Sequence, residues 1–216
     1  MSCFKRSSFF VTFKNMIYSY LALGDSYTIG EKVLLSQSFP CQAIQLLRQN
    51  NLPFVAPEII AKTGWTTDEL QSEIDTKLFL EKYDFVSLLI GVNNQYRERS
   101  MAEYEIQFEQ LLLKAISLGG YNLKNVFVLS IPDWSTMPFA KDRNIEKISK
   151  EIEAFNKISK NITTKLGCTF LDITESQIND SKNPEMIAED GLHPSALEYS
   201  KWAKKLATAI AEICYS

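Results

Sequence analysis

Histidine and cysteine are scarce in this sequence, and their scarcity excludes several kinds of site. There is one histidine in 216 residues, so a centre that needs two histidines is excluded. The four cysteines lie far apart and form no closely spaced pair of the kind that holds structural zinc: Cys3, Cys41, Cys168 and Cys214. We therefore expect no metal site. A chain of this length also buries enough apolar surface to need no disulfide framework.

Long apolar runs and an excess of one charge are also missing. The 23 basic and 26 acidic side chains leave a net charge of −3, which predicts no general attraction to nucleic acid or anionic lipid. The longest apolar stretch in the body of the chain, near residues 85–90, is far too short to span a bilayer. We accordingly predict no integral membrane segment and no nucleic-acid partner.

The first fifteen residues differ from the rest of the chain. Lys5 and Arg6 precede a short apolar run and faintly resemble a signal peptide, but Lys14 interrupts that run and no small-residue cleavage site follows. We interpret residues 1–15 as a poorly defined extension or a misassigned start, and residues 16–216 as one domain. With no convincing signal peptide, a cytoplasmic location is expected.

Short apolar runs alternate with amphipathic segments through the domain. The runs are nearly continuous in apolar residues, as in strands buried on both faces of a parallel sheet, and they span residues 16–23, 54–61, 85–90, 126–131 and 168–173. Strict alternation of strands and helices predicts a three-layer α/β/α sandwich with right-handed crossovers. Ligands of such sheets bind beyond the carboxyl ends of the strands.

Three helices are predicted most clearly by apolar residues at helical spacing. One runs through residues 104–115 and ends at Gly119–Gly120, and a second runs from Ile145 to Ile162 and ends near Gly167. The last helix is predicted to carry Pro194 in its first turn.

The segment Gly24–Gly30 that follows the first strand fits none of the common nucleotide or hydrolase loops. It lacks the glycine spacing of a dinucleotide turn, of a P-loop and of the G-x-S-x-G nucleophile elbow. A flavodoxin-type phosphate loop stays open, since Ser26, Tyr27 and Thr28 offer hydroxyl groups at a strand-to-helix turn. The polar residues after the other strands would then have no task.

An acyl-transfer reaction would use the polar residues that follow the strands. A serine hydroxyl needs a base, and His193 is the only imidazole in the chain. Asp190, three residues earlier, can bind Nδ1 of the ring and fix its tautomer. The backbone N–H groups of Ser26 and Gly64 and the side-chain amide of Asn93 could stabilise an oxyanion. One alternative is that Ser26 only caps a helix. Another is that Asp190 and His193 bind a metal, but the sequence offers no evident third ligand.

The order Gly24-Asp25-Ser26, Gly64, Gly91-x-Asn93, Asp190-x-x-His193 resembles the SGNH/GDSL hydrolase family over residues 18–205. The resemblance implies a flavodoxin-like fold with five parallel strands and ester hydrolysis through an acyl-serine. It implies Ser26 as nucleophile, His193 as base and then acid, and Asp190 as its partner. Ser26, Gly64 and Asn93 would form the oxyanion hole, and no metal or organic cofactor is implied.

Two residues depart from the pattern of the family. Tyr27 stands where many members have leucine, which affects the lining beside the nucleophile, and Asn94 replaces the aspartate that often follows the oxyanion asparagine. Four aromatic residues follow strand ends and either line a substrate pocket or cover the sheet: Tyr27, Trp65, Tyr96 and Trp134. Arg97 and Arg99 either meet an anionic group or are solvated loop charges.

The sequence thus predicts a serine esterase or acylhydrolase that acts on a small ester, with lipid, acetylated-sugar, thioester and aryl substrates all open. A carbohydrate O-deacetylase of the same fold is one alternative, since aromatic side chains at a pocket rim can stack on a sugar ring. A flavodoxin-like binding module without turnover is another.

Overall fold

The centre of the computed structural model, which describes residues 17–216, is a five-stranded parallel sheet. The strands lie in the order β2-β1-β3-β4-β5. Their bounds are β1 (Tyr20–Gly24), β2 (Glu58–Ala61), β3 (Phe85–Leu89), β4 (Val126–Leu129) and β5 (Thr169–Leu171). Every residue of β1, β3 and β4 is buried, which explains why these strands are apolar on both faces.

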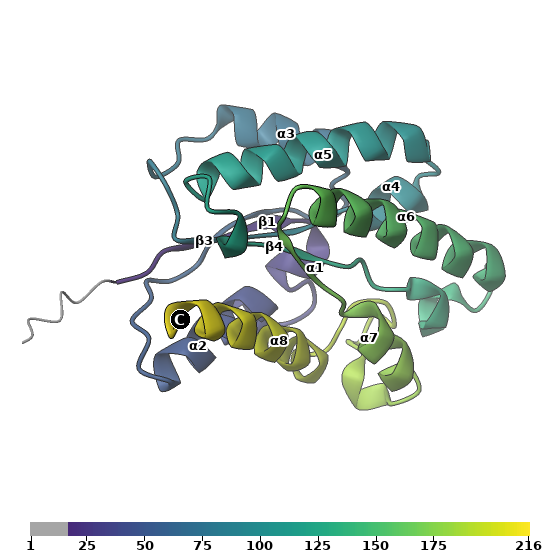
Figure 1. Cartoon of the computed structure of the whole chain (residues 1–216). Coiled ribbons are helices and arrows are strands. Elements are labelled where there is room, and N and C mark those ends of the chain that lie inside the picture. Colours follow the sequence, from purple (N-terminus) through teal and green to yellow (C-terminus); the bar gives the residue numbers. More distant parts are fainter. Residues whose placement is uncertain (1–16) are drawn as a thin grey trace, which may run out of the picture.

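Helices cover both faces of this sheet (Figure 1). On one face α2 (Phe39–Gln49) packs against α8 (Ala196–Cys214). The other face is covered by α3 (Thr67–Thr76), α5 (Met101–Leu118) and α6 (Ile145–Lys165). Three short helices complete the set: α1 (Ser26–Ile29), α4 (Val92–Tyr96) and α7 (Thr174–Asp180). The predicted three-layer α/β/α architecture is confirmed.

The strands are shorter than their apolar runs predicted. Residue 16 lies outside the described residues, and Tyr18 forms only an isolated bridge with Phe54 before β1 begins at Tyr20. The predicted second strand started at residue 54, but β2 begins at Glu58, because Pro57 has no N–H to donate to a ladder. The predicted strands at 126–131 and 168–173 are also shorter in the structure, since β4 lacks the last two of those residues and β5 lacks the first one and the last two.

The predicted helices exist, with two corrections. Pro194 does not lie in the first turn of α8; Ser195 is the N-cap, and Pro194 forms an antiparallel bridge with Ile187. The helical spacing predicts Ile145 on the apolar stripe of α6, but Ile145 is the first residue of that helix and is 53% exposed.

The strand order fixes where a ligand can reach the sheet. The chain runs from β1 outward to β2 and then crosses to β3 on the other side of β1. The loops after β1 and β3 therefore lead to opposite faces and leave a crevice between them, which is the usual binding position in such sheets.

Within residues 17–216, no helix combines the length and apolar content required to cross a membrane. The three cysteines of that part of the chain are free thiols: Cys41, Cys168 and Cys214.

Candidate active site

The serine of the site lies where β1 turns into α1. Gly24 ends the strand, and a Cβ there would lie 2.1 Å from Oγ1 of Thr28 and 2.4 Å from the carbonyl oxygen of Leu89, so only glycine fits. Asp25 caps the helix by accepting the N–H of Tyr27 at 3.0 Å. Ser26 is the first residue of α1, so its own N–H has no partner within the helix.

The histidine and its carboxylate partner come from the loop before α8. Oδ1 of Asp190 accepts the backbone N–H groups of Leu192 and His193, both at 3.0 Å, while Oδ2 lies 2.6 Å from Nδ1 of His193. Nε2 of the same ring lies 3.0 Å from Oγ of Ser26. The loop is fixed by the bond from the Ala188 N–H to the His193 carbonyl at 2.8 Å. Hydroxyl, imidazole and carboxylate therefore touch in series.

These contacts fix the ionisation of Asp190 and the tautomer of the ring. Partial burial alone would raise the pKa of the Asp190 carboxyl, but the bonds from the His193 ring and from two backbone N–H groups outweigh it and lower that pKa. Because an ionised carboxylate only accepts hydrogen bonds, Nδ1 carries the proton. The lone pair of Nε2 then faces the Ser26 hydroxyl, as a general base requires.

Three hydrogen-bond donors belong to residues that line the cavity at Ser26, namely the N–H groups of Ser26 and Gly64 and the side-chain amide of Asn93. Gly64 has a φ of +85°, and its N–H, like that of Ser26, donates to no acceptor in the described part of the chain. Asn93 is in the first turn of α4, and its amide donates to the Trp65 carbonyl at 3.0 Å and makes a long contact of 3.4 Å with Oδ2 of Asp25. Ser26, Gly64, Asn93 and His193 all line one cavity of about 220 Å³.

Asp25 is a fully buried acid beside these donors. Burial raises the pKa of its carboxyl to about 7, although the N–H groups of Tyr27 and of Asp25 itself and the amide of Asn93 favour the ionised form. Its bonds are those of a structural group that orients α1 and contacts Asn93.

Residues 22–201 match the family model described as the GDSL-like lipase/acylhydrolase family, which covers most of the chain. The protein belongs to this family. The resemblance stated on four sequence blocks is thereby confirmed.

Known proteins that resemble this chain are distant from it in sequence and close to it in fold. An acetylxylan esterase of Geobacillus stearothermophilus is 22% identical over an alignment of 191 positions, which covers 82% of this chain and 77% of the esterase. The crystal structure of a lipase/acylhydrolase from Enterococcus faecalis superimposes over 90% of this chain and 95% of the E. faecalis chain, with a TM-score of 0.74 and 18% sequence identity. The crystal structure of the acetylxylan esterase Axe2 of G. stearothermophilus covers 89% and 94%, with a TM-score of 0.71 and 19% identity. TesA covers 89% and 97%, with a TM-score of 0.69 and 18% identity. These structural similarities show the shared fold.

The cavity of this GDSL-family protein has mostly apolar walls. Of the four aromatic residues for which pocket lining and sheet cover were both open, Tyr27, Tyr96 and Trp134 line the cavity, whereas Trp65 does not and packs against the core. The rings of Tyr96 and Trp134 lie 5.5 Å apart, and Nε1 of Trp134 donates to Gln95 at 2.8 Å, which fixes the indole.

Four further lining residues were not anticipated from the sequence: Thr63, Val92, Phe139 and Leu192. Three of them directly precede the predicted site residues Gly64, Asn93 and His193 in the sequence, and this adjacency was the one sequence feature that could have predicted them. Phe139 belongs to a single helical turn, Pro138–Ala140, and carries no such signal. Its N–H donates to the Gly191 carbonyl at 3.0 Å, a long-range contact that brings it beside the histidine loop.

No group of three or more His, Cys, Asp or Glu side chains within residues 17–216 is placed to hold a metal ion. The two arginines after α4, for which an anionic ligand and solvated loop charges were both open, pair with carboxylates of the protein. Arg97 pairs with Glu69 at 3.1 Å, and Arg99 lies 3.9 Å from Asp68 and 3.8 Å from Glu103.

Asn94, which departs from the family pattern, bonds with Thr67 at the start of α3. Its side-chain oxygen accepts the Thr67 N–H, and its side-chain NH₂ donates to the Thr67 hydroxyl.

Proposed function

We propose that this protein hydrolyses small carboxylic esters through an acyl intermediate on Ser26. The observation that carries the proposal is the series of contacts from Ser26 Oγ to His193 Nε2 at 3.0 Å and from His193 Nδ1 to Asp190 Oδ2 at 2.6 Å, at the wall of an accessible cavity. Membership of a family of esterases and acylhydrolases supports the same chemistry.

The reaction follows from these groups in two halves. His193 takes the Ser26 proton as Oγ bonds to the ester carbonyl carbon, and the oxyanion accepts hydrogen bonds from the Ser26 and Gly64 N–H groups and the Asn93 amide. The ester C–O bond then breaks, and the departing alcohol takes the proton from His193. Water, deprotonated by the same ring, attacks the acyl-serine, and breaking its C–O bond releases the acid and returns the proton to Ser26.

Short acyl chains suit the cavity. Pockets for drug-sized ligands hold roughly 300–1,000 Å³, whereas this cavity holds about 220 Å³. Its apolar walls would receive an acyl group of a few carbons beside His193. We therefore propose acetyl and similarly short esters as substrates.

A carbohydrate O-deacetylase is the second candidate, and a neighbouring recess favours it. Beyond the Tyr96 and Trp134 rings lies a recess of about 330 Å³, which those two residues also line. Its other walls are polar or charged for the most part and include Glu98, Arg143 and Asn144, which suits an alcohol with several hydroxyl groups. One distant relative and one similar structure carry the name acetylxylan esterase.

Labelling with a fluorophosphonate, followed by peptide mass mapping, tests the central proposal. Wild type should carry the label on Ser26, and Ser26→Ala should carry none and lose ester hydrolysis. His193→Ala should react about 10²–10⁴-fold more slowly, because it lacks the general base. Ser36→Ala removes an exposed serine and is the matched control, which should react like wild type. An unlabelled Ser26 in folded wild type would refute the proposal and favour a binding module.

The substrate class is tested separately with para-nitrophenyl esters from acetate to octanoate and with peracetylated xylose. We expect kcat/KM to fall steeply beyond butyrate. A preference for octanoate would contradict the short-chain proposal, and turnover of the sugar acetate above that of the aryl acetate would favour the second candidate.

A further inference from the structure

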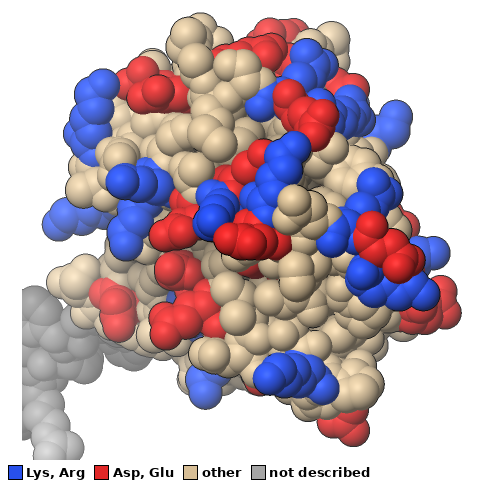
Figure 2. All heavy atoms as spheres, turned by 90° about the vertical axis from the view of Figure 1, so that its right-hand side faces the viewer, with Lys and Arg blue, Asp and Glu red and all other residues tan. Residues whose placement is uncertain are grey.

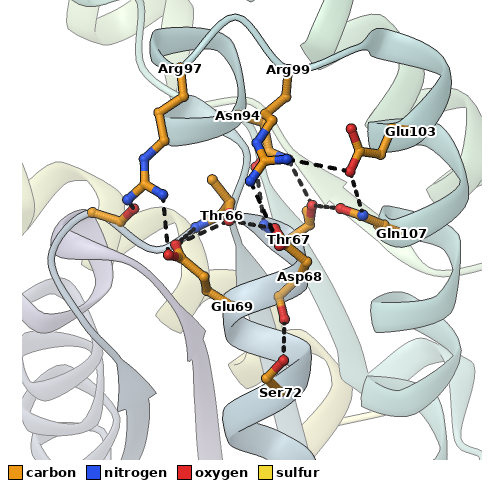
Figure 3. Close-up of polar contacts among 11 residues, drawn as sticks. Thr66, Thr67, Asp68, Glu69, Ser72, Asn94, Arg97, Arg99, Glu103 and Gln107 are labelled. Carbon is orange, nitrogen blue, oxygen red and sulfur yellow. Dashed lines mark hydrogen bonds and ion pairs between the residues drawn. The ribbon is translucent and has the colours of Figure 1, made fainter.

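A cluster of polar contacts joins the end of α4 to the turn that carries Gly64 and to the start of α3 (Figure 3). From it we infer that Arg97 is a positioning residue for the reaction, whose guanidinium holds the Gly64 turn in the position from which the Gly64 N–H supplies an oxyanion donor. The inference rests on the esterase function proposed above.

The two terminal nitrogens of the Arg97 guanidinium donate to two different groups, the Gly64 carbonyl and the Glu69 carboxylate. Nη2 donates to the Gly64 carbonyl oxygen at 2.6 Å, and Nη1 donates to Oε1 of Glu69 at 3.1 Å. The second oxygen of Glu69 accepts the N–H of Thr66 at 2.9 Å, in the capping box that starts α3. The guanidinium therefore ties the turn to the first turn of a helix, and its planar fork holds the two donors in fixed directions toward these two acceptors.

The same short helix holds the next residues of the turn at two more points. The amide of Asn93 donates to the Trp65 carbonyl at 3.0 Å. Asn94 accepts the N–H of Thr67 at 3.1 Å and donates to its hydroxyl at 2.7 Å. Three side chains of α4 and its cap thus hold residues 64–67, and Arg97 is the one that holds Gly64.

The direction of the Gly64 N–H depends on the form of this turn. The N–H of Trp65 donates to the Lys62 carbonyl at 3.2 Å, which closes a turn with Gly64 as its third residue. A φ of +85° at that position is typical of a type II turn. In a type I turn the peptide between Thr63 and Gly64 is turned over, and the N–H points the opposite way. That reversal leaves the Gly64–Trp65 peptide in place, so the bond from Arg97 to the Gly64 carbonyl does not select between the two forms. It fixes the position of the turn, and with it the position of the Gly64 N–H, relative to α3 and α4.

Arg97 acts through the turn and not on the substrate. It is not among the residues that line the cavity, and both ends of its guanidinium are already bonded. Arg99, two residues later, provides a matched comparison. It has similar exposure and pairs with carboxylates, but it donates to no carbonyl of the turn. Figure 3 shows both arginines extending toward the start of α3.

Steady-state hydrolysis of para-nitrophenyl acetate by Arg97→Ala, Arg97→Lys and Arg99→Ala tests the inference. Loss of an oxyanion donor costs about 10²–10³ in kcat, and a loosened donor less, so Arg97→Ala should lose about 10- to 100-fold in kcat with KM nearly unchanged. Arg99→Ala should stay within about 2-fold of wild type, since it loses only exposed ion pairs. Arg97→Lys should fall between wild type and the alanine variant.

Addition of guanidinium separates positioning from a general loss of stability. The site of the Arg97 side chain is 41% exposed, so the free ion can enter it. About 20 mM guanidinium chloride, far below the molar range that unfolds proteins, should restore at least part of kcat in Arg97→Ala, whereas equal sodium chloride should not.

Several outcomes would overturn the inference. They are an unchanged kcat in Arg97→Ala, an equal loss in Arg99→Ala, full activity in Arg97→Lys and an absence of guanidinium rescue. All of them presuppose an active wild type with a labelled Ser26. If the esterase proposal itself is wrong, the wild-type protein neither reacts with fluorophosphonate nor hydrolyses the ester, and this result is obtained before any Arg97 variant is compared.

Discussion

At the scale of single residues, the least expected feature is the buried acid that precedes Ser26. Asp25 is fully buried, and its folded-state pKa is raised from 3.8 to about 7. Between these two values the folded protein holds a proton that the unfolded chain has released. Folding stability associated with this group is therefore lost as the pH rises from about 4 to about 7.

The variant Asp25→Asn tests this linkage. An amide cannot ionise but can still accept the N–H of Tyr27. The free energy of unfolding of the variant therefore does not fall with rising pH through this group, as that of wild type does. We expect the free energy of unfolding of the variant relative to wild type to rise by up to about 4 kcal/mol between pH 4 and pH 8. Urea denaturation across that range measures it, and a constant cost of the amide cancels in the comparison.

Asp75→Asn, on an exposed position of α3, is the control and should show no such trend. A difference between Asp25→Asn and wild type that is independent of pH would show that the carboxyl is ionised throughout.

Single residues of the site were predictable where chemistry restricts the residue type. One histidine in the chain left no choice of base, and Ser26, Gly64 and Asn93 each follow a strand whose end had to lie at the same edge. The orientation of Trp65 was not predictable, because it depends on the backbone turn at Gly64, which directs the indole to the core.

At the scale of elements, the cap of α8 stabilises the helix that follows the histidine loop. Oγ of Ser195 accepts the N–H groups of Leu197 at 3.2 Å and Glu198 at 3.4 Å. It also donates to the Glu185 carbonyl at 2.5 Å, which links the cap to the preceding loop.

Replacing this cap should lower stability measurably. Ser195→Ala leaves two N–H groups of the first turn without their acceptor, and we expect a loss of about 1 kcal/mol, and no more than about 2 kcal/mol, in the free energy of unfolding. Ser200→Ala, in the interior of the same helix, removes a hydroxyl that bonds only to the Leu197 carbonyl and should be close to neutral. Equal losses in the two variants would argue against a capping role.

The existence and order of elements were predictable, and their ends were not. Apolar runs predicted all five strands, because the three central strands are fully buried and the edge strands β2 and β5 are half-buried. The ends depend on individual hydrogen bonds, such as the ladder bond that Pro57 cannot make, and on the bridge that draws Pro194 out of α8. The short helix α4 has too few residues to show an apolar period, although it orients the site.

At the scale of the whole molecule, charge is distributed without a strong patch on the face shown in Figure 2, where acidic and basic side chains alternate. Apart from the pairs that involve His193 or Glu198, the ion pairs of residues 17–216 join side chains that are between 27% and 77% exposed. Exposed pairs of this kind contribute little each.

Stability should therefore depend weakly on salt. Raising sodium chloride from about 0.05 M to about 0.5 M should change the free energy of unfolding by no more than about 2 kcal/mol, because screening removes only these small contributions. Thermal or urea unfolding at matched pH measures the effect. A much larger loss would mean that an ion-pair network, and not the apolar core, holds the fold together.

The distance along the chain between the two halves of the site has a consequence for synthesis. Ser26 precedes His193 by 167 residues. At about 5–20 residues per second, a ribosome adds the histidine roughly 10–30 s after the serine. On the mechanism proposed above, Ser26 lacks its base throughout that interval, so ester cleavage would begin only when translation has nearly finished the domain.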